Sequence, residues 1–117
     1  MADDRLRLYQ RLLESVDGIE EKANFGSSYT AVTGNMYSII SKHGVVGIRL
    51  PDEERVAFMA RYGADVFRGD PAWPPAKEYV AVPDDLLERT DELAPYLARS
   101  LAHALTLKPK ATKKPAG

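Results

Sequence analysis

Few side chains in this sequence have the type and spacing that catalysis or metal binding requires. The two histidines, His43 and His103, lie 60 residues apart and neither belongs to a catalytic or metal-binding motif. The sequence has no cysteine, which excludes a thiolate nucleophile, cysteine-ligated zinc and a disulfide framework. It also has no H-E-x-x-H motif, glycine-rich phosphate loop or G-x-S-x-G elbow. We therefore expect both histidines to be ordinary exposed residues, and we expect no catalytic residue, metal ligand or cofactor.

Two acidic runs, Asp52-Glu53-Glu54 and Asp84-Asp85, each follow a proline. Carboxylates are favoured in the first turn of a helix because they complement its dipole. Each run therefore predicts the start of a helix, and neither is needed as an acid–base pair. The sequence predicts a protein that is not an enzyme.

A basic and aromatic group on two predicted strands is the first candidate for a binding surface. Strand alternation places Arg49 on the face opposite the apolar residues of strand 45–50, and it places Lys77 and Tyr79 on the corresponding face of strand 77–82, with Tyr37 nearby. Such a surface can stack bases and hold phosphate, as single-strand nucleic-acid binders do. It can equally be a dimer face or a partly solvated sheet.

The segment Pro71-Ala72-Trp73-Pro74-Pro75 is a stiff loop that contains the only tryptophan. Loops often carry functional contacts, so Trp73 can present its indole to a ligand or a partner. Trp73 can also fold back over one edge of the core. A small-ligand sensor with its pocket under this loop is one of the alternatives that the sequence leaves open.

The last ten residues, 108–117, differ in charge from the rest of the chain. They contain no acid and four lysines, Lys108, Lys110, Lys113 and Lys114, whereas the other 107 residues hold 12 basic and 17 acidic side chains, a net charge of −5. The segment has no large apolar residue, so we predict a disordered basic tail after a single domain over residues 1–107. Such a tail is a solubilising terminus or a weak, non-specific polyanion-binding arm.

The remaining sequence predicts an α+β domain in the order α-β-β-β-α-β-α. Apolar periodicity predicts helices over residues 4–16, 51–62 and 91–107, with a short helical turn after Pro83. Inward-facing residues are expected as follows: Leu6, Tyr9, Leu12, Leu13, Val16; Val56, Met59, Ala60; Leu93, Leu97, Leu101, Ala104, Leu105. Pro95 is expected in the first turn of the last helix, where a missing amide is tolerated. A β meander, with a hairpin turn at Thr33-Gly34-Asn35, and the later strand 77–82 form a mainly antiparallel sheet.

Composition indicates one ordinary globular domain. The chain has 117 residues, of which 44% are hydrophobic and 28% charged. Its apolar stretches are too short to span a bilayer, and the N-terminus has no signal-peptide pattern. We expect a cytoplasmic protein with no membrane contact, and the sequence leaves its partner and oligomeric state open.

A dispersed set of aromatic, glycine and proline positions resembles the N-terminal domain of the TfoX/Sxy family. The matching segments are Phe25-Gly26, Gly34-Asn35-Met36-Tyr37 and Tyr79-x-x-Val82-Pro83 followed by Leu86, although Asn24 stands where the family has methionine. The similarity spans most of residues 5–105. The MmcQ/YjbR-like proteins are similar in outline and are the alternative assignment.

The resemblance implies a fold more than a chemistry. Full-length TfoX/Sxy proteins are associated with the regulation of natural competence genes and carry a second, helical domain, which these 117 residues do not match. The resemblance therefore implies a small bacterial regulatory or protein-interaction module with no recognised catalytic residues, and it does not extend to competence regulation.

Overall fold

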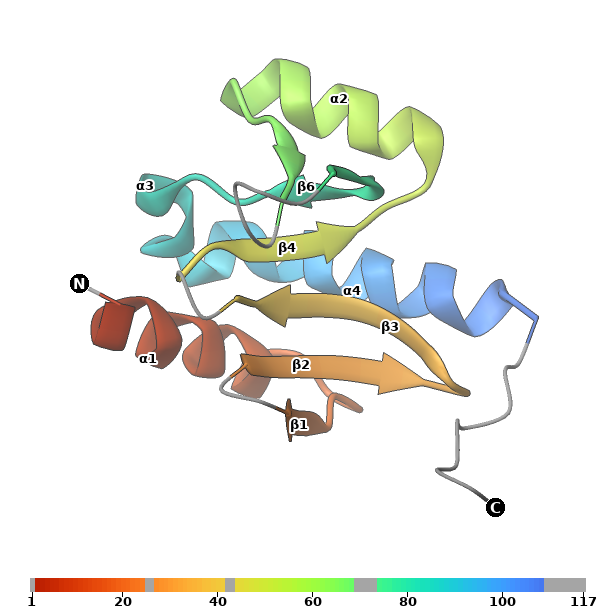
Figure 1. Ribbon diagram of the computed structural model, residues 1–117, viewed down its shortest axis with the longest axis horizontal. Coiled ribbons are helices and arrows are strands. Elements are labelled where there is room, and N and C mark those ends of the chain that lie inside the picture. The colour runs from red at the N-terminus through yellow and green to blue at the C-terminus, as the bar shows by residue number, and fades with distance from the viewer. Residues whose placement is uncertain (1, 25–26, 42–43, 69–73, 109–117) are drawn as a thin grey trace.

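A six-stranded antiparallel sheet forms the centre of the molecule (Figure 1). The computed structural model describes residues 2–24, 27–41, 44–68 and 74–108. The helices are α1 (Ala2–Glu14), α2 (Asp52–Tyr62), α3 (Asp84–Leu87) and α4 (Thr90–Thr106). The strands are β1 (Glu21–Asn24), β2 (Ser27–Val32), β3 (Asn35–Ile40), β4 (Val46–Arg49), β5 (Val66–Phe67) and β6 (Ala76–Ala81). They are ordered β1-β2-β3-β4-β6-β5 across the sheet.

The predicted α+β class, with helices at the start, middle and end of the chain, is confirmed. The sequence did not predict β1 or β5. β1 is polar throughout, and it pairs antiparallel with β2 from Glu21 opposite Thr30 to Asn24 opposite Ser27. β1 and β2 are therefore two separate strands that pair with each other.

The hairpin between β2 and β3 is the tight turn that the sequence predicts. Thr33 and Gly34 have positive φ angles of 50° and 80°, and Val32 pairs directly with Asn35. Positive φ at both central residues is the type I′ turn, which matches the twist of the two strands. The turn thus fixes the register of β3 against β2.

All four helices lie on one face of the sheet, and α4 crosses behind β3 and β4 (Figure 1). α1, α2 and α3 each pack against α4 or the strands beneath it. The buried core between helices and sheet includes Tyr9, Phe58 and Leu97 from the helices and Ile48 and Val80 from the strands. Burial of Tyr9, Leu12 and Leu13 on α1 was predicted correctly.

The inward face of α2 differs from the predicted one. Val56 is 60% exposed and Ala60 is exposed, whereas Phe58 is buried. The ring of Phe58 packs edge-on against Tyr96 of α4, with ring centroids 5.0 Å apart. The helix is therefore rotated so that its aromatic side chains face α4, and only Met59 of the predicted residues packs against the core.

Two other predicted core residues face solvent. Leu105 of α4 is 56% exposed and Leu6 of α1 is 37% exposed. Leu93, Leu97 and Ala104 are buried as predicted. The side of α4 that packs against other elements is narrower than the row of apolar residues along the helix. Leu105 therefore lies outside the contact.

The expectation for Pro95 is also wrong. α4 begins at Thr90, so Pro95 is its sixth residue and lies beyond the first turn. A proline there removes the hydrogen bond to the carbonyl four residues earlier. Asp91 and Pro95 are both exposed, so water can bond the carbonyl that lacks a donor.

In the part of the chain that the structure describes, no helix has the length and apolar character that crossing a bilayer demands.

Candidate functional site

The sheet face turned away from the helices is the candidate functional surface, and we call it the open face. Ser38 and Ile40 of β3 are buried toward the helices, so Ile39 between them points to the other side. A row of direct cross-strand partners shares that side with Ile39: Lys22, Tyr29, Gly47 and Ala81. The same alternation adds Ala31 and its partner Met36.

Phe67 covers one part of the open face. A Cβ atom on Gly47 would lie 2.6 Å from two atoms of the Phe67 ring, far inside the distance that carbon atoms tolerate. Gly47 therefore leaves the space in which the ring of Phe67 sits on β4. Phe67 is only 5% exposed, and its ring centroid lies 6.2 Å from that of Tyr79.

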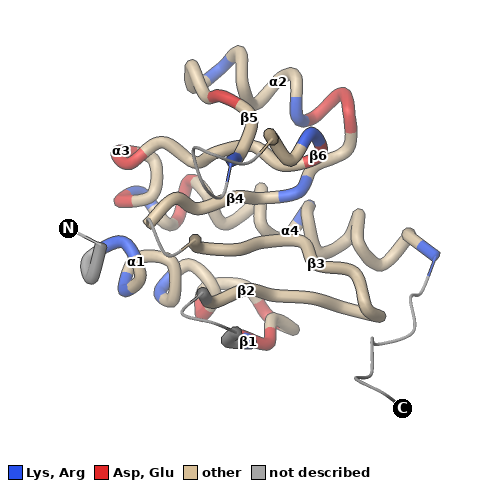
Figure 2. Tube along the Cα trace, in the orientation of Figure 1, with Lys and Arg blue, Asp and Glu red and all other residues tan. Residues whose placement is uncertain are grey.

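The part of the open face over β2 and β3 is uncharged. The twelve residues of these two strands include no acid and no base (Figure 2). Tyr29, Ala31, Met36 and Ile39 are partly exposed there. No helix in the described ranges covers them, because all four helices pack on the opposite face. The centre of this surface is thus apolar and accessible.

Arg49 and Tyr79, two residues of the predicted binding surface, are direct cross-strand partners at the margin of the open face. The Arg49 guanidinium lies 5.9 Å from the centroid of the Tyr79 ring. It also donates two hydrogen bonds to Glu78, of 2.9 and 2.6 Å. Lys77 lines a shallow concavity of about 310 Å³ together with them.

The contacts of Arg49 and Tyr79 give them a structural role. β4 ends at Arg49 while β3 and β6 continue, so the two strands have no neighbour between them beyond that point. The Tyr79 hydroxyl donates to the carbonyl of Met36 at 2.8 Å, and Arg49 donates to the same carbonyl at 3.3 Å. The two side chains thereby connect β3 to β6 across the gap that β4 leaves.

Ser100 of α4 contacts β3 and β4 near the end of β4, from the helix side of the sheet. Its hydroxyl is buried and lies within hydrogen-bond distance of two carbonyl oxygens, that of Tyr37 in β3 at 3.0 Å and that of Arg49 in β4. Burial of an unpaired carbonyl is costly. Ser100 therefore stabilises the point at which β3 and β4 separate.

Burial governs the protonation of Tyr79. Burial raises its pKa to about 12, and the nearby Arg49 guanidinium opposes part of that rise. The hydroxyl therefore stays protonated and able to donate to Met36 at neutral pH.

Tyr37 does not lie on the open face, contrary to the prediction. Thr30 pairs with Ser38 and Ala31 pairs with Met36, which leaves Tyr37 as an extra residue in β3. Such a bulge turns one side chain away from the regular alternation. Tyr37 is 1% exposed and lies in the core, where burial raises its pKa.

Some predicted positions lie outside the described residues, namely Trp73, His43, Lys110, Lys113 and Lys114. Lys108 is described and exposed. Its backbone carbonyl accepts a hydrogen bond of 3.1 Å from Asn35, which connects the end of α4 to the β2–β3 hairpin.

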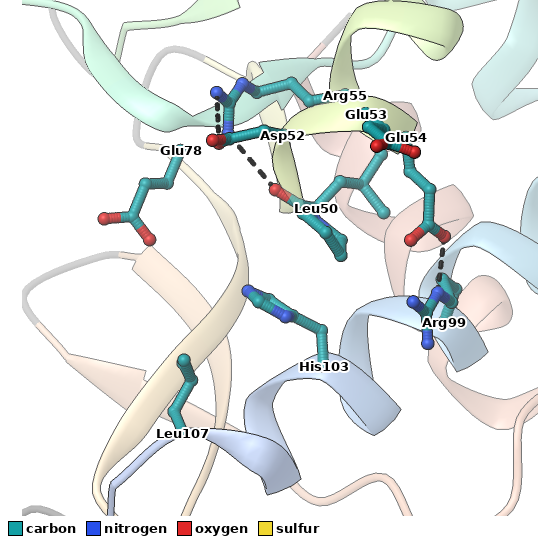
Figure 3. A pocket seen from close by; sticks show the side chains of 10 residues that line it. Leu50, Asp52, Glu53, Glu54, Arg55, Glu78, Arg99, His103 and Leu107 are labelled. Carbon is teal, nitrogen blue, oxygen red and sulfur yellow. Dashed lines mark hydrogen bonds and ion pairs between the residues drawn. The ribbon is translucent and has the colours of Figure 1, made fainter.

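A groove of about 590 Å³ lies on the helix side, beyond the end of β4 (Figure 3). Its lining comprises Leu50, Pro51, Asp52, Glu53, Glu54, Arg55, Glu78, Arg99, His103 and Leu107. His103 points into this groove and is partly buried, whereas the sequence predicted an exposed side chain. Arg99, His103 and Leu107 recur every four residues along α4 and its C-terminal end, and this spacing is the signal that could have revealed the groove.

Most of the charged side chains that line the groove form ion pairs with one another. Arg55 pairs with Asp52 at 2.8 Å, and Arg99 pairs with Glu54. The hydrogen bond from Arg99 is the main reason that the pKa of Glu54 is lowered. Within the described ranges, no group of three or more histidine or acidic side chains is arranged to hold a metal ion. The groove is therefore lined by two ion pairs, Asp52 with Arg55 and Glu54 with Arg99.

Comparison with family models confirms the resemblance to the TfoX N-terminal domain. The sequence model of the TfoX N-terminal domain matches residues 11–104, a range that extends from α1 to α4 and includes every strand. A comparison with curated proteins gives no match. The matched range covers most of the chain, and the chain therefore belongs to the TfoX N-terminal domain family.

Proposed function

We propose that this protein is a non-enzymatic regulatory or protein-interaction module whose contact surface is the open face. The observation that carries the proposal is the uncharged stretch of β2 and β3, which no described helix covers. The water-facing side of an antiparallel sheet is normally polar. A contiguous apolar patch on a surface is typical of a protein-interaction site.

The non-enzymatic part of the proposal rests on the absence of a catalytic motif in the sequence and on the paired charges of the groove. A regulatory role agrees with membership of the TfoX N-terminal domain family. The proposal places the module in the bacterial cytoplasm, because a cysteine-free composition is compatible with a reducing compartment.

The alternatives from the sequence use other parts of the chain. Weak nucleic-acid binding would depend on the lysine tail, and small-ligand sensing would depend on the Trp73 loop. The structure describes Lys108 alone among the four tail lysines and does not describe Trp73. The uncharged face over β2 and β3 favours contact with a protein, since a polyanion would need clustered cations.

The test is affinity capture from the native host's lysate with matched variants. Ile39→Asp places a charge at the centre of the open face, whereas Val56→Asp places the same charge at a 60% exposed position on α2. We expect a protein that the wild type and Val56→Asp retain and that Ile39→Asp loses. Equal capture by all three proteins would overturn the proposed surface, provided that circular dichroism shows each variant folded.

A further inference from the structure

We propose that the occupant of the open face is a second copy of this chain, bound through the same face in a two-fold symmetric dimer. This inference rests on the proposed function, because it names the partner of the same surface. A symmetric contact brings identical patches together. A patch with net charge would then repel itself, whereas an uncharged patch would not. β2 and β3 meet that requirement along their whole length.

The charges at the margin of the patch come in opposite pairs. On the β1 side, Lys22 lies 3.7 Å from Glu20, and on the β4–β6 side Arg49 lies 2.6 Å from Glu78. The margin thus carries both signs, which suits a self-complementary contact more than a strongly acidic or basic partner. The whole chain has a net charge of −1, so two copies repel only weakly.

The shape of the patch also suits self-pairing. Along β2, the large side chain of Tyr29 is followed on the same face by the small side chain of Ala31. In the proposed dimer, a two-fold rotation would bring Tyr29 of one copy over Ala31 of the other. Interdigitation of this kind gives the shape complementarity that specific interfaces require.

The available area sets the expected strength. β2 and β3 have six residues each, so each is about 20 Å long, and two strands span about 10 Å, which gives the uncharged patch about 200 Å² in projection. A standard interface buries about 800 Å² on each partner. The contact is therefore small, and we expect a dimer that dissociates on dilution.

Sedimentation equilibrium from micromolar to millimolar concentration tests the inference on the full chain. We expect a monomer–dimer equilibrium that Ile39→Asp weakens at least about tenfold. The matched variant Val56→Asp should dimerise like the wild type. The dissociation constant should change little with salt, because the centre of the contact is uncharged.

Two further measurements separate this contact from other kinds of self-association. A variant that ends at Lys108 should still dimerise, whereas attraction between the lysine tail and the acidic body would be lost with the tail and with added salt. Amide shifts that change on dilution should belong to Tyr29, Ala31 and Ile39. These shifts need no substitution, so they test the contact even if Ile39→Asp fails to fold.

Three results would overturn the inference: a wild type that is monomeric at every concentration, a dimer that Ile39→Asp leaves intact, or dilution shifts on other surfaces. The wild type could instead be monomeric and still capture a host protein in a way that depends on Ile39. That result would reject a second copy as the partner. The proposed function would then stand with a different partner.

Discussion

At the scale of single residues, Gly47 determines whether Phe67 can lie on the sheet. We predict that Gly47→Ala lowers the free energy of unfolding by about 1–3 kcal/mol, the usual cost of overpacking. The added Cβ would lie 2.6 Å from the ring, and the ring has little room because Phe67 is buried beside Tyr79. Urea denaturation of the two proteins measures the difference.

A double-mutant cycle provides the control for the Gly47 substitution. In a Phe67→Ala background the added methyl has space, so Gly47→Ala should cost close to nothing or stabilise the strand slightly. If the cost is the same with and without the Phe67 ring, the ring is not what requires glycine at this position.

Tyr79 should make stability depend on alkaline pH. Its pKa is raised by burial to about 12 in the folded state, from an ordinary value of 10.0. Below pH 10 both states hold the proton, and between pH 10 and 12 the unfolded state releases it first. Stability should therefore fall with rising pH in that window. Tyr79→Phe should reduce the slope by up to about 1.4 kcal/mol per pH unit.

The measurement for Tyr79 is urea denaturation of wild type and Tyr79→Phe from about pH 7 to 12. At neutral pH the variant should lose only about 1 kcal/mol, the value of the hydrogen bond to Met36. Other buried tyrosines, such as Tyr9 with its raised pKa, contribute to both curves and cancel in the comparison. Identical slopes in the alkaline window would contradict the assignment.

At the scale of secondary-structure elements, α4 contributes a narrow face to the core. Leu97 is fully buried and Leu105 is 56% exposed on the same helix. We predict that Leu97→Ala costs about 2–5 kcal/mol of stability, through lost burial and the cavity that remains. Leu105→Ala, the matched control, should change stability by less than about 0.5 kcal/mol. Thermal or urea denaturation that ranks the two equally would contradict the orientation of α4.

The sequence predicted the elements better than their faces. Alternation in strands placed Arg49, Lys77 and Tyr79 together, because a period of two holds wherever a strand is regular. Alternation predicted the wrong side of the sheet for Tyr37, because one extra residue in β3 reverses the direction of its side chain. No local pattern reports a bulge, which depends on the register between β2 and β3.

The predicted inward face of α2 was wrong for a related reason. The period of α2 indicates an apolar side but not which neighbour that side meets. Phe58 faces Tyr96, a residue 38 positions later in the chain, and that contact turns Val56 to solvent. β1 was missed because it has no apolar alternation and depends on pairing with β2. The groove was missed because its lining comes from three separate segments.

At the scale of the whole molecule, the tail and the body have opposite charges, which limits any binding to nucleic acid. If the chain binds duplex DNA through its four tail lysines, a plot of the logarithm of the binding constant against the logarithm of the salt concentration should have a slope of about −3.6. The body, with its net charge of −5, opposes the attraction, so we expect no sequence preference and little binding at physiological salt. Fluorescence anisotropy with labelled duplexes over a salt series measures both.

Deletion of residues 108–117 is the control for the tail prediction. The deletion removes all four tail lysines and leaves every helix and strand in place. It should abolish the binding and leave the fold and its melting temperature nearly unchanged. Tight, base-selective binding by the truncated protein would instead direct attention to Arg49, Lys77 and Tyr79.

The packing of α1 against α4 has a consequence for the timing of folding during synthesis. Tyr9 and Leu12 of the first helix share one core with Leu93, Leu97 and Ala104 of α4. Until α4 leaves the ribosome, the other helices cover only part of the helix side of the sheet, because Leu93, Leu97 and Ala104 are missing from the core. The apolar residues of the central strands therefore reach full burial only after nearly all of the domain has been made.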